Sequence, residues 1–122
     1  MADPNIVGVS TITLENSLTN ISSETTTTIL SAVSTGSVVR LKEVRVSENS
    51  ASTTAVTLNY YDAIPGTSYP IVNNHNIPLG STSVIFSGVL HVKEGDSITI
   101  TTDDPDGTTV DVTVTVTYEV LS

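Results

Sequence analysis

The chain has 122 residues, a length that suits one domain, and its composition excludes several classes of protein. With 13 acidic against 4 basic residues the net charge is −9, the opposite of what phosphate binding by a nucleic-acid-binding protein requires. Cysteine is absent, which excludes disulfides, thiol nucleophiles and cysteine-ligated metals. No apolar run approaches the roughly 18 residues of a membrane span, and no secretory signal is visible, so we expect a soluble protein made in the cytoplasm.

The N-terminal part of the chain predicts two strands separated by a polar connection. Residues 6–14 form the first strand, with Ile12 and Leu14 in phase, and residues 16–24 form the connection. Residues 25–33 carry four consecutive threonines followed by three larger aliphatic side chains, which predicts a second strand that enters the core.

A change of phase marks the third predicted strand, residues 38–47. Two of its aliphatic side chains occupy odd positions and the next two occupy even positions. One extra residue near Lys42 or Glu43 would bring all four to the same side, which predicts a β-bulge. The four side chains are Val39, Leu41, Val44 and Val46.

The middle of the chain predicts shorter strands between turns. Residues 64–76 contain two prolines and several asparagines, which predicts a long loop with no more than a short strand at residues 69–72. Gly88 is expected to divide the following segment into two strands. The other predicted strands are residues 54–61, 81–86, 89–92 and 97–102.

The C-terminal segment, residues 108–121, alternates without interruption. Valines and Tyr118 face one side, while threonines, acids and Leu121 face the other, which predicts one buried and one wetted face. Such a strand spans roughly 40 Å, about twice the usual length. Its unpaired backbone would promote aggregation, so we expect it to be paired inside a sandwich or across a subunit boundary.

These segments together give about eight strands and no long stretch of helical periodicity. They predict an all-β, antiparallel β-sandwich of the jelly-roll or Greek-key type. We expect a single domain over residues 1–122, in which residues 1–14 provide an N-terminal arm or edge strand.

The residues that could carry catalysis do not form a recognisable pattern. Asp103, Asp104 and Asp106 could hold a calcium ion, but Asp, Pro and Gly are also the usual residues of a hairpin turn, which is the favoured interpretation. His75 and His91 have no partner at a metal-binding or acid–base spacing, and no serine lies in a Gly-x-Ser-x-Gly turn. The sequence therefore predicts no catalytic residue, no metal and no cofactor, and a protein that is not an enzyme.

Two groups of residues are candidates for contact with a partner. An apolar, weakly phased group near the N-terminus could add a strand to the sheet edge of a neighbouring molecule. Three tyrosines could stack against a sugar, as in a glycan-binding adhesin module, although packing at a sheet edge or subunit contact is favoured. The candidate interface residues are Ile6, Val7, Val9, Tyr60, Tyr61 and Tyr69.

Taken in order, several segments resemble a family of small jelly-roll structural proteins of tailed bacteriophages. The last of them contains the pattern Leu-x-Val-x-x-Gly-Asp-x-Ile, in which Gly95 and Asp96 occupy a tight turn between two strands. The chain departs from the family pattern at residues 6–14 and 64–76. The segments that carry the resemblance are residues 28–33, 39–46, 48–53, 55–58 and 89–100.

The resemblance implies a non-enzymatic component of a virion. The first expectation is a capsid decoration, or cement, protein that stabilises the shell, and the alternative is a neck, tail or fibre-base protein. The implied partners are other copies of the chain, in a homotrimer or higher oligomer, and the major capsid protein or other virion proteins. Neither nucleic acid nor a membrane is an expected partner.

Overall fold

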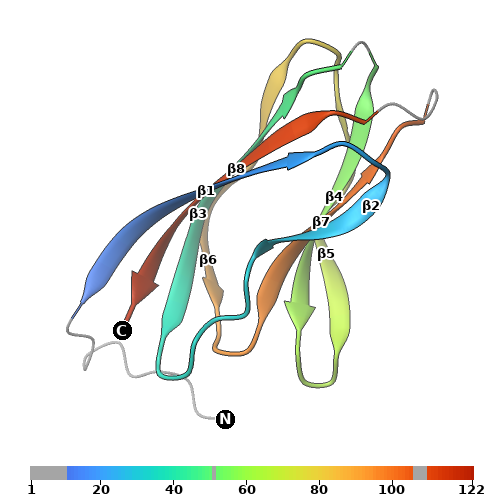
Figure 1. Cartoon of the computed structure of the whole chain (residues 1–122). Helices are drawn as coiled ribbons and strands as arrows, with labels where there is room; N and C mark the ends of the chain where they lie inside the picture. The colour runs from blue at the N-terminus through green and yellow to red at the C-terminus, as the bar shows by residue number, and fades with distance from the viewer. Residues whose placement is uncertain (1–10, 51, 106–109) are drawn as a thin grey trace.

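The computed structural model describes residues 11–50, 52–105 and 110–122, and these residues form eight strands and no helix. Figure 1 shows the strands arranged in two layers. Within the described residues, no helix is long and apolar enough to cross a membrane. The strands are β1 (Ile12–Ile21), β2 (Thr25–Leu30), β3 (Val38–Glu48), β4 (Thr54–Asp62), β5 (Thr67–Ile77), β6 (Thr82–Val92), β7 (Ser97–Asp103) and β8 (Val112–Leu121).

Two four-stranded antiparallel sheets make up the sandwich. Sheet I has the strand order β1-β8-β3-β6, and sheet II has the order β2-β7-β4-β5. The pairs are nested along the chain, because β4 pairs with β5, β3 with β6, β2 with β7 and β1 with β8. This nesting defines a jelly roll and confirms the predicted antiparallel sandwich.

The core lies between the two sheets and is built mainly from aliphatic side chains. Burying one such side chain contributes about 1.5–3 kcal/mol. The aromatic side chains of Tyr60, Phe86 and Tyr118 are only partly buried and pack against this core. The fully buried side chains include Leu41, Val44, Val46, Leu58, Ile98, Ile100, Val112 and Val114.

The bulge predicted in β3 is confirmed. The register of β3 with both of its neighbours, β6 and β8, shifts between Leu41 and Glu43. The shift changes the parity of the residues that face the core, so the aliphatic side chains on both sides of it are buried. These side chains are Val39, Leu41, Val44 and Val46.

The first strand differs from the prediction in position and length. β1 runs to Ile21, although the polar composition of residues 16–24 predicts a connection. Ten consecutive residues of β1 pair with β8 without a register shift. This continuous ladder pairs the backbone groups that β1 directs towards β8, so its polar side chains do not require a loop. Residues 6–10, where the predicted strand begins, lie outside the described residues.

Two predictions for the middle of the chain are wrong. Residues 67–76 belong to strand β5, which includes the short strand foreseen at residues 69–72, and the chain turns only at residues 63–66. β5 is an edge strand of sheet II, and edge strands tolerate a residue such as Pro70 that has no N–H to donate. β6 is one strand rather than two, because the chain continues through Gly88 at a φ of 140° with a register shift against β3.

The alternation predicted for the C-terminal strand holds on its buried side but not throughout its wetted side. Leu121 is only 1% exposed, although its position places it with the wetted threonines. Its neighbours in the sheet are Ile12 on β1 and Val38 on β3, so this end of the outer face is aliphatic rather than polar.

Candidate assembly surface

β1, one of the two edge strands of sheet I, exposes large aliphatic side chains. In the described part of the chain, β1 pairs with β8 and with no other strand (Figure 1). Ile12, Leu14 and Leu18 are 58%, 65% and 69% exposed. Alternate residues of a strand share a face, so these side chains form one row together with Asn16, and we call these four residues the β1 row. Exposed aliphatic side chains on an edge strand indicate a contact surface.

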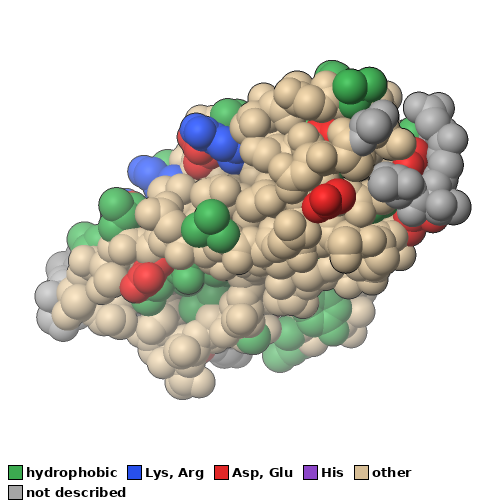
Figure 2. Space-filling model, turned by 45° about the horizontal axis from the view of Figure 1, so that its top comes forward, with side chains coloured by type: hydrophobic (Ala, Val, Ile, Leu, Met, Phe, Trp, Pro, Cys, Tyr) green, Lys and Arg blue, Asp and Glu red, His purple; other side chains and the backbone are tan. Residues whose placement is uncertain are grey.

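Beside the β1 row, sheet I carries paired charges. Nε of Arg40 lies 3.2 Å from Oε1 of Glu119, and Nζ of Lys42 lies 3.9 Å from the same oxygen. Nη2 of Arg45 lies 2.9 Å from Oε1 of Glu43. Figure 2 likewise shows Lys and Arg side chains adjoining Asp or Glu on the face that it presents. These side chains are partly exposed, so each pair contributes at most about 1 kcal/mol.

The structure separates the three tyrosines of the predicted interface. Tyr60 on β4 lies opposite Tyr69 on β5, so both project from the same face of sheet II. Tyr61 follows Tyr60 along the strand and projects from the other face. Tyr61 and Tyr69 are 36% and 51% exposed. The three rings do not share one face, which removes the geometric basis of a single sugar-stacking platform, and their contact with a partner stays a prediction.

The hydroxyl group of Tyr60 instead connects separate segments of the chain. It donates a 2.6 Å hydrogen bond to Oδ2 of Asp96 and accepts one of 3.3 Å from the N–H of Lys93. Oδ1 of Asp96 accepts a 3.0 Å bond from the N–H of Ala63. Burial and the hydrogen bond to Asp96 raise the pKa of Tyr60 to about 12. These hydrogen bonds, which we call the Tyr60–Asp96 clasp, connect β4 to the turn before β7.

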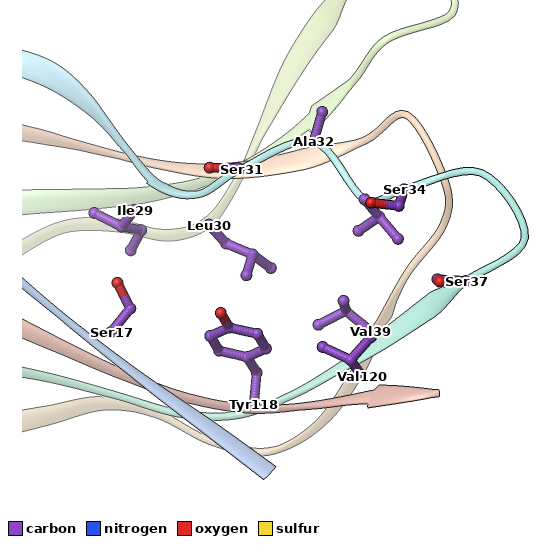
Figure 3. Close-up of a pocket in the computed structure, with 11 residues that line it drawn as sticks. Ser17, Ile29, Leu30, Ser31, Ala32, Ser34, Ser37, Val39, Tyr118 and Val120 are labelled. Carbon is purple, nitrogen blue, oxygen red and sulfur yellow. The ribbon is translucent and has the colours of Figure 1, made fainter. Parts of the chain in front are cut away.

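An open cavity of about 230 Å³ lies between β1 and the segment that follows β2. Figure 3 shows the ring of Tyr118 and the side chain of Leu30 pointing into it. The 11 lining residues in that view include serines and aliphatic residues but no charged side chain. The cavity therefore offers no acid–base pair.

The acidic turn after β7 contacts a carboxyl group from the start of β2. The N–H of Asp104 donates a 3.2 Å hydrogen bond to Oε2 of Glu24. A side-chain hydrogen bond with Asp103 raises the pKa of the exposed Glu24 above its ordinary value. Among the described residues, no group of three acidic or histidine side chains could hold a metal ion. Asp106, the third acid of the predicted calcium turn, lies outside those residues.

The remaining predicted residues are not brought together. His75 lies on β5 in sheet II, whereas His91 lies on β6 in sheet I. The predicted N-terminal arm residues Ile6, Val7 and Val9 lie outside the described residues, and their role stays a prediction.

The β1 row is not among the candidate contact residues that the sequence predicts. Its signal was present, because Ile12, Leu14 and Leu18 occupy even positions of one short segment. The segment was divided between a strand and a polar connection, so Leu18 fell outside the predicted strand. The sequence predicts an edge strand only as far as residue 14, as an alternative to an N-terminal arm, because the full strand order depends on pairings far apart in the sequence.

No family model matches the chain, and no curated protein matches it. Solved structures do resemble it. A structure of infectious bursal disease virus, strain Gx, aligns with 93% of this chain at 12% identity and a TM-score of 0.55. The alignment covers 33% of the virus protein, so this chain spans about a third of that protein's length.

Two further structures have lower structural similarity. A chain of the cyanophage Pam1 capsid asymmetric unit is 18% identical, with a TM-score of 0.44, and the alignment covers 99% of this chain and 91% of that one. The disulfide-linked Bacillus endospore appendage pilus is also 18% identical, with a TM-score of 0.47 and coverage of 91% and 87%. The likeness to the bursal disease virus protein supports the jelly-roll fold, which is what an identity this low can establish.

Proposed function

We propose that this chain is a non-enzymatic structural protein of a virus particle, and specifically a capsid decoration protein of a tailed bacteriophage. The observation that carries the proposal is the β1 row, a line of exposed aliphatic side chains on an edge strand. A protein that acts as a single copy gains nothing from such a row, whereas a protein that assembles buries it.

Two other observations support this role. The jelly roll is shared with the infectious bursal disease virus structure, although that likeness by itself concerns only the fold. The net charge of −9 keeps free copies apart before they assemble. The partners in this proposal are other copies of the chain, as a trimer or higher oligomer, and the major capsid protein of the shell.

The copy number in purified particles tests this function. Particles would be collected from the culture that produces the chain, and the chain quantified by mass spectrometry against the major capsid protein. Hundreds of copies per particle are expected for a decoration protein. Only about a dozen copies per particle would instead indicate a protein of the neck or tail. Absence of the chain from the particles would overturn the proposal.

The N-terminal arm is a separate part of the proposal. Deleting residues 2–10 is expected to abolish attachment to the shell or oligomerisation while leaving the sandwich folded. Circular dichroism would confirm folding, and co-sedimentation with particles would report attachment. If attachment and oligomerisation both survive the deletion, the arm has no such role.

A further inference from the structure

β1 lacks the features that protect the other three sheet edges. β2 has only six residues, β5 contains Pro70 and a positive φ at Asn74, and β6 passes through Gly88. The ladders of all three also contain register shifts. β1 instead pairs over ten residues without a shift and contains no proline, glycine or lysine. Natural sheets use such irregularities to prevent edge-to-edge pairing, so β1 is the edge best suited to accept another strand.

Among the described residues, the backbone groups of β1 that have no strand partner belong to the same residues as the β1 row. Thr11 and Ser122 exchange two backbone hydrogen bonds, each of 3.0 Å. Directly opposite residues in an antiparallel ladder alternate between bonded and non-bonded pairs, so the odd-numbered residues of β1 bond to β8. The even-numbered residues from Ile12 to Asn20 therefore direct their N–H and C=O groups away from β8, towards the open edge.

The β1 sequence is complementary to itself about Asn16. In an antiparallel pair of β1 strands centred on Asn16, Leu14 of each copy lies opposite Leu18 of the other. In this register each even-numbered residue lies opposite another even-numbered residue. Since these residues direct their N–H and C=O groups away from β8, they can form the hydrogen-bonded pairs between the two copies. A pair centred on Ser17 would overlap as far, from Thr13 to Ile21, and would also pair even-numbered residues with each other. In that pair each leucine lies opposite an asparagine, so the Asn16-centred register is the one that brings the leucines together.

The charge of β1 permits two copies to approach. Glu15 is the single charged residue of the strand, although the chain as a whole carries −9. In the Asn16-centred register Glu15 lies opposite Ser17 of the other copy, so no two acids are directly opposed. The contact involves about ten residues on each side, fewer than the roughly 20–30 of a standard interface. We therefore expect weak association in solution. Association should be stronger where copies are concentrated on a particle.

We infer that β1 is the binding site for β1 of a second copy, in an antiparallel pair centred on Asn16 that joins two sheets I into one eight-stranded sheet. The inference rests on the proposed function only in taking a second copy as the partner. Its test is made with the purified chain, so it can fail while particle incorporation succeeds, and the reverse also holds.

Disulfide cross-linking tests this register directly, because the chain has no cysteine of its own. In the proposed pair the two Asn16 Cα atoms lie about 5.5 Å apart, within the range that a disulfide spans. Asn16→Cys is therefore expected to form a covalent dimer under mild oxidation. Ile12→Cys is the matched control on the same row, because its two copies would lie roughly 27 Å apart.

The pattern of cross-links decides the outcome. The inference predicts a dimer for Asn16→Cys, none for Ile12→Cys alone, and a mixed dimer when Ile12→Cys is combined with Asn20→Cys. Equal cross-linking of Asn16→Cys and Ile12→Cys, or no cross-link of folded Asn16→Cys at millimolar concentration, would overturn it. If Asn16→Cys cross-links only after residues 2–10 are deleted, that segment rather than a second copy occupies the edge.

A charge exchange provides an independent test that needs no cysteine. Leu14→Glu and Leu18→Lys are each expected to weaken association about tenfold, because each replaces both aliphatic pairs of the symmetric contact. The double variant places the introduced carboxylate of each copy opposite the introduced amine of the other and should recover association, as measured by sedimentation equilibrium. Within one chain these positions are about 13 Å apart and cannot pair. A double variant weaker than either single variant would contradict the register.

Discussion

β8 and β1 are hydrogen-bonded to each other over ten residue pairs, yet their aliphatic side chains have opposite environments. Val112, Val114 and Val116 of β8 are at most 1% exposed, whereas Leu14 and Leu18 of β1 are at least 65% exposed. β8 lies between two strands and its valines face the other sheet, whereas β1 is an edge strand whose leucines face outwards. The face of the sheet on which a side chain lies, rather than its hydrophobicity, therefore separates the residues that stabilise the fold from those available for assembly.

The largest expected effect compares two leucines of sheet I. Leu41 is fully buried on β3, so Leu41→Ala is expected to lower the free energy of unfolding by about 2–5 kcal/mol. Leu18→Ala is expected to change it by no more than about 0.5 kcal/mol. Urea denaturation of both variants, measured at a concentration where the chain is monomeric, would check the contrast. Similar losses for the two would mean that β1 belongs to the core.

The Tyr60–Asp96 clasp is expected to show the next largest effect. Tyr60→Phe leaves the buried carboxylate of Asp96 without its 2.6 Å hydrogen bond, and we expect a loss of about 1–3 kcal/mol in the free energy of unfolding. Tyr61→Phe is the matched control, since Tyr61 is exposed and projects from the other face of the sheet. Tyr60→Phe should have a lower melting temperature than Tyr61→Phe. Equal melting temperatures would contradict a stabilising role of the Tyr60–Asp96 clasp.

The clasp also predicts an alkaline limit to stability. The folded state favours the neutral phenol, because the pKa of Tyr60 is raised to about 12 from an ordinary value of about 10. Its contribution is therefore complete below about pH 10 and is lost as the pH rises through about 12. Denaturation between these pH values should show a smaller decline for Tyr60→Phe than for the native chain. Parallel curves would show that another group controls the decline.

Proline substitutions test the alternation of hydrogen bonds along β1. The N–H of Ser17 faces β8, whereas the N–H of Leu18 faces the open edge. Ser17→Pro is therefore expected to destabilise the fold by about 1 kcal/mol more than Leu18→Pro, which should chiefly weaken association. Chemical denaturation and sedimentation would measure the two effects. If Leu18→Pro destabilised the fold more than Ser17→Pro, the even-numbered residues rather than the odd-numbered ones would bond to β8, and the assignment would be wrong.

The smallest expected effect concerns Glu24, which is exposed. Because its pKa is raised in the folded state, its protonated form is favoured there, and stability declines slightly as the pH rises from its ordinary pKa through the raised value. Glu24→Gln keeps an uncharged side chain at every pH and should remove this decline. Melting temperatures across mildly acidic pH would check it, and an unchanged decline would exclude Glu24 as its source.

The sequence predicted those parts of the fold that depend on local patterns. Valine alternation predicted β8, and a change of parity predicted the β3 bulge, because each signal lies within one strand. The extent of β1 and the strand character of β5 depend on pairing partners elsewhere in the chain. Polar residues 16–20 and the prolines near β5 therefore suggested loops, and only the ladders with β8 and β4 show otherwise.

The candidate site was less predictable than the fold. The notable tyrosines proved to be divided between two faces, with Tyr60 held by Asp96. Leu14 and Leu18 were visible in the sequence, but their exposure follows from the outer face on which they lie, since Ile21 on the inner face of the same strand is buried. Which face of β1 is covered depends on long-range packing, and this is the information that the sequence alone lacked.

Sedimentation velocity of the native chain over a wide concentration range tests the central claim most directly. If the β1 row is an assembly surface, the mean sedimentation coefficient should rise with concentration, and Leu18→Lys should shift this rise to higher concentration while remaining folded. A native chain that stays monomeric up to millimolar concentration, or a Leu18→Lys variant that associates as readily as the native chain, would contradict the account.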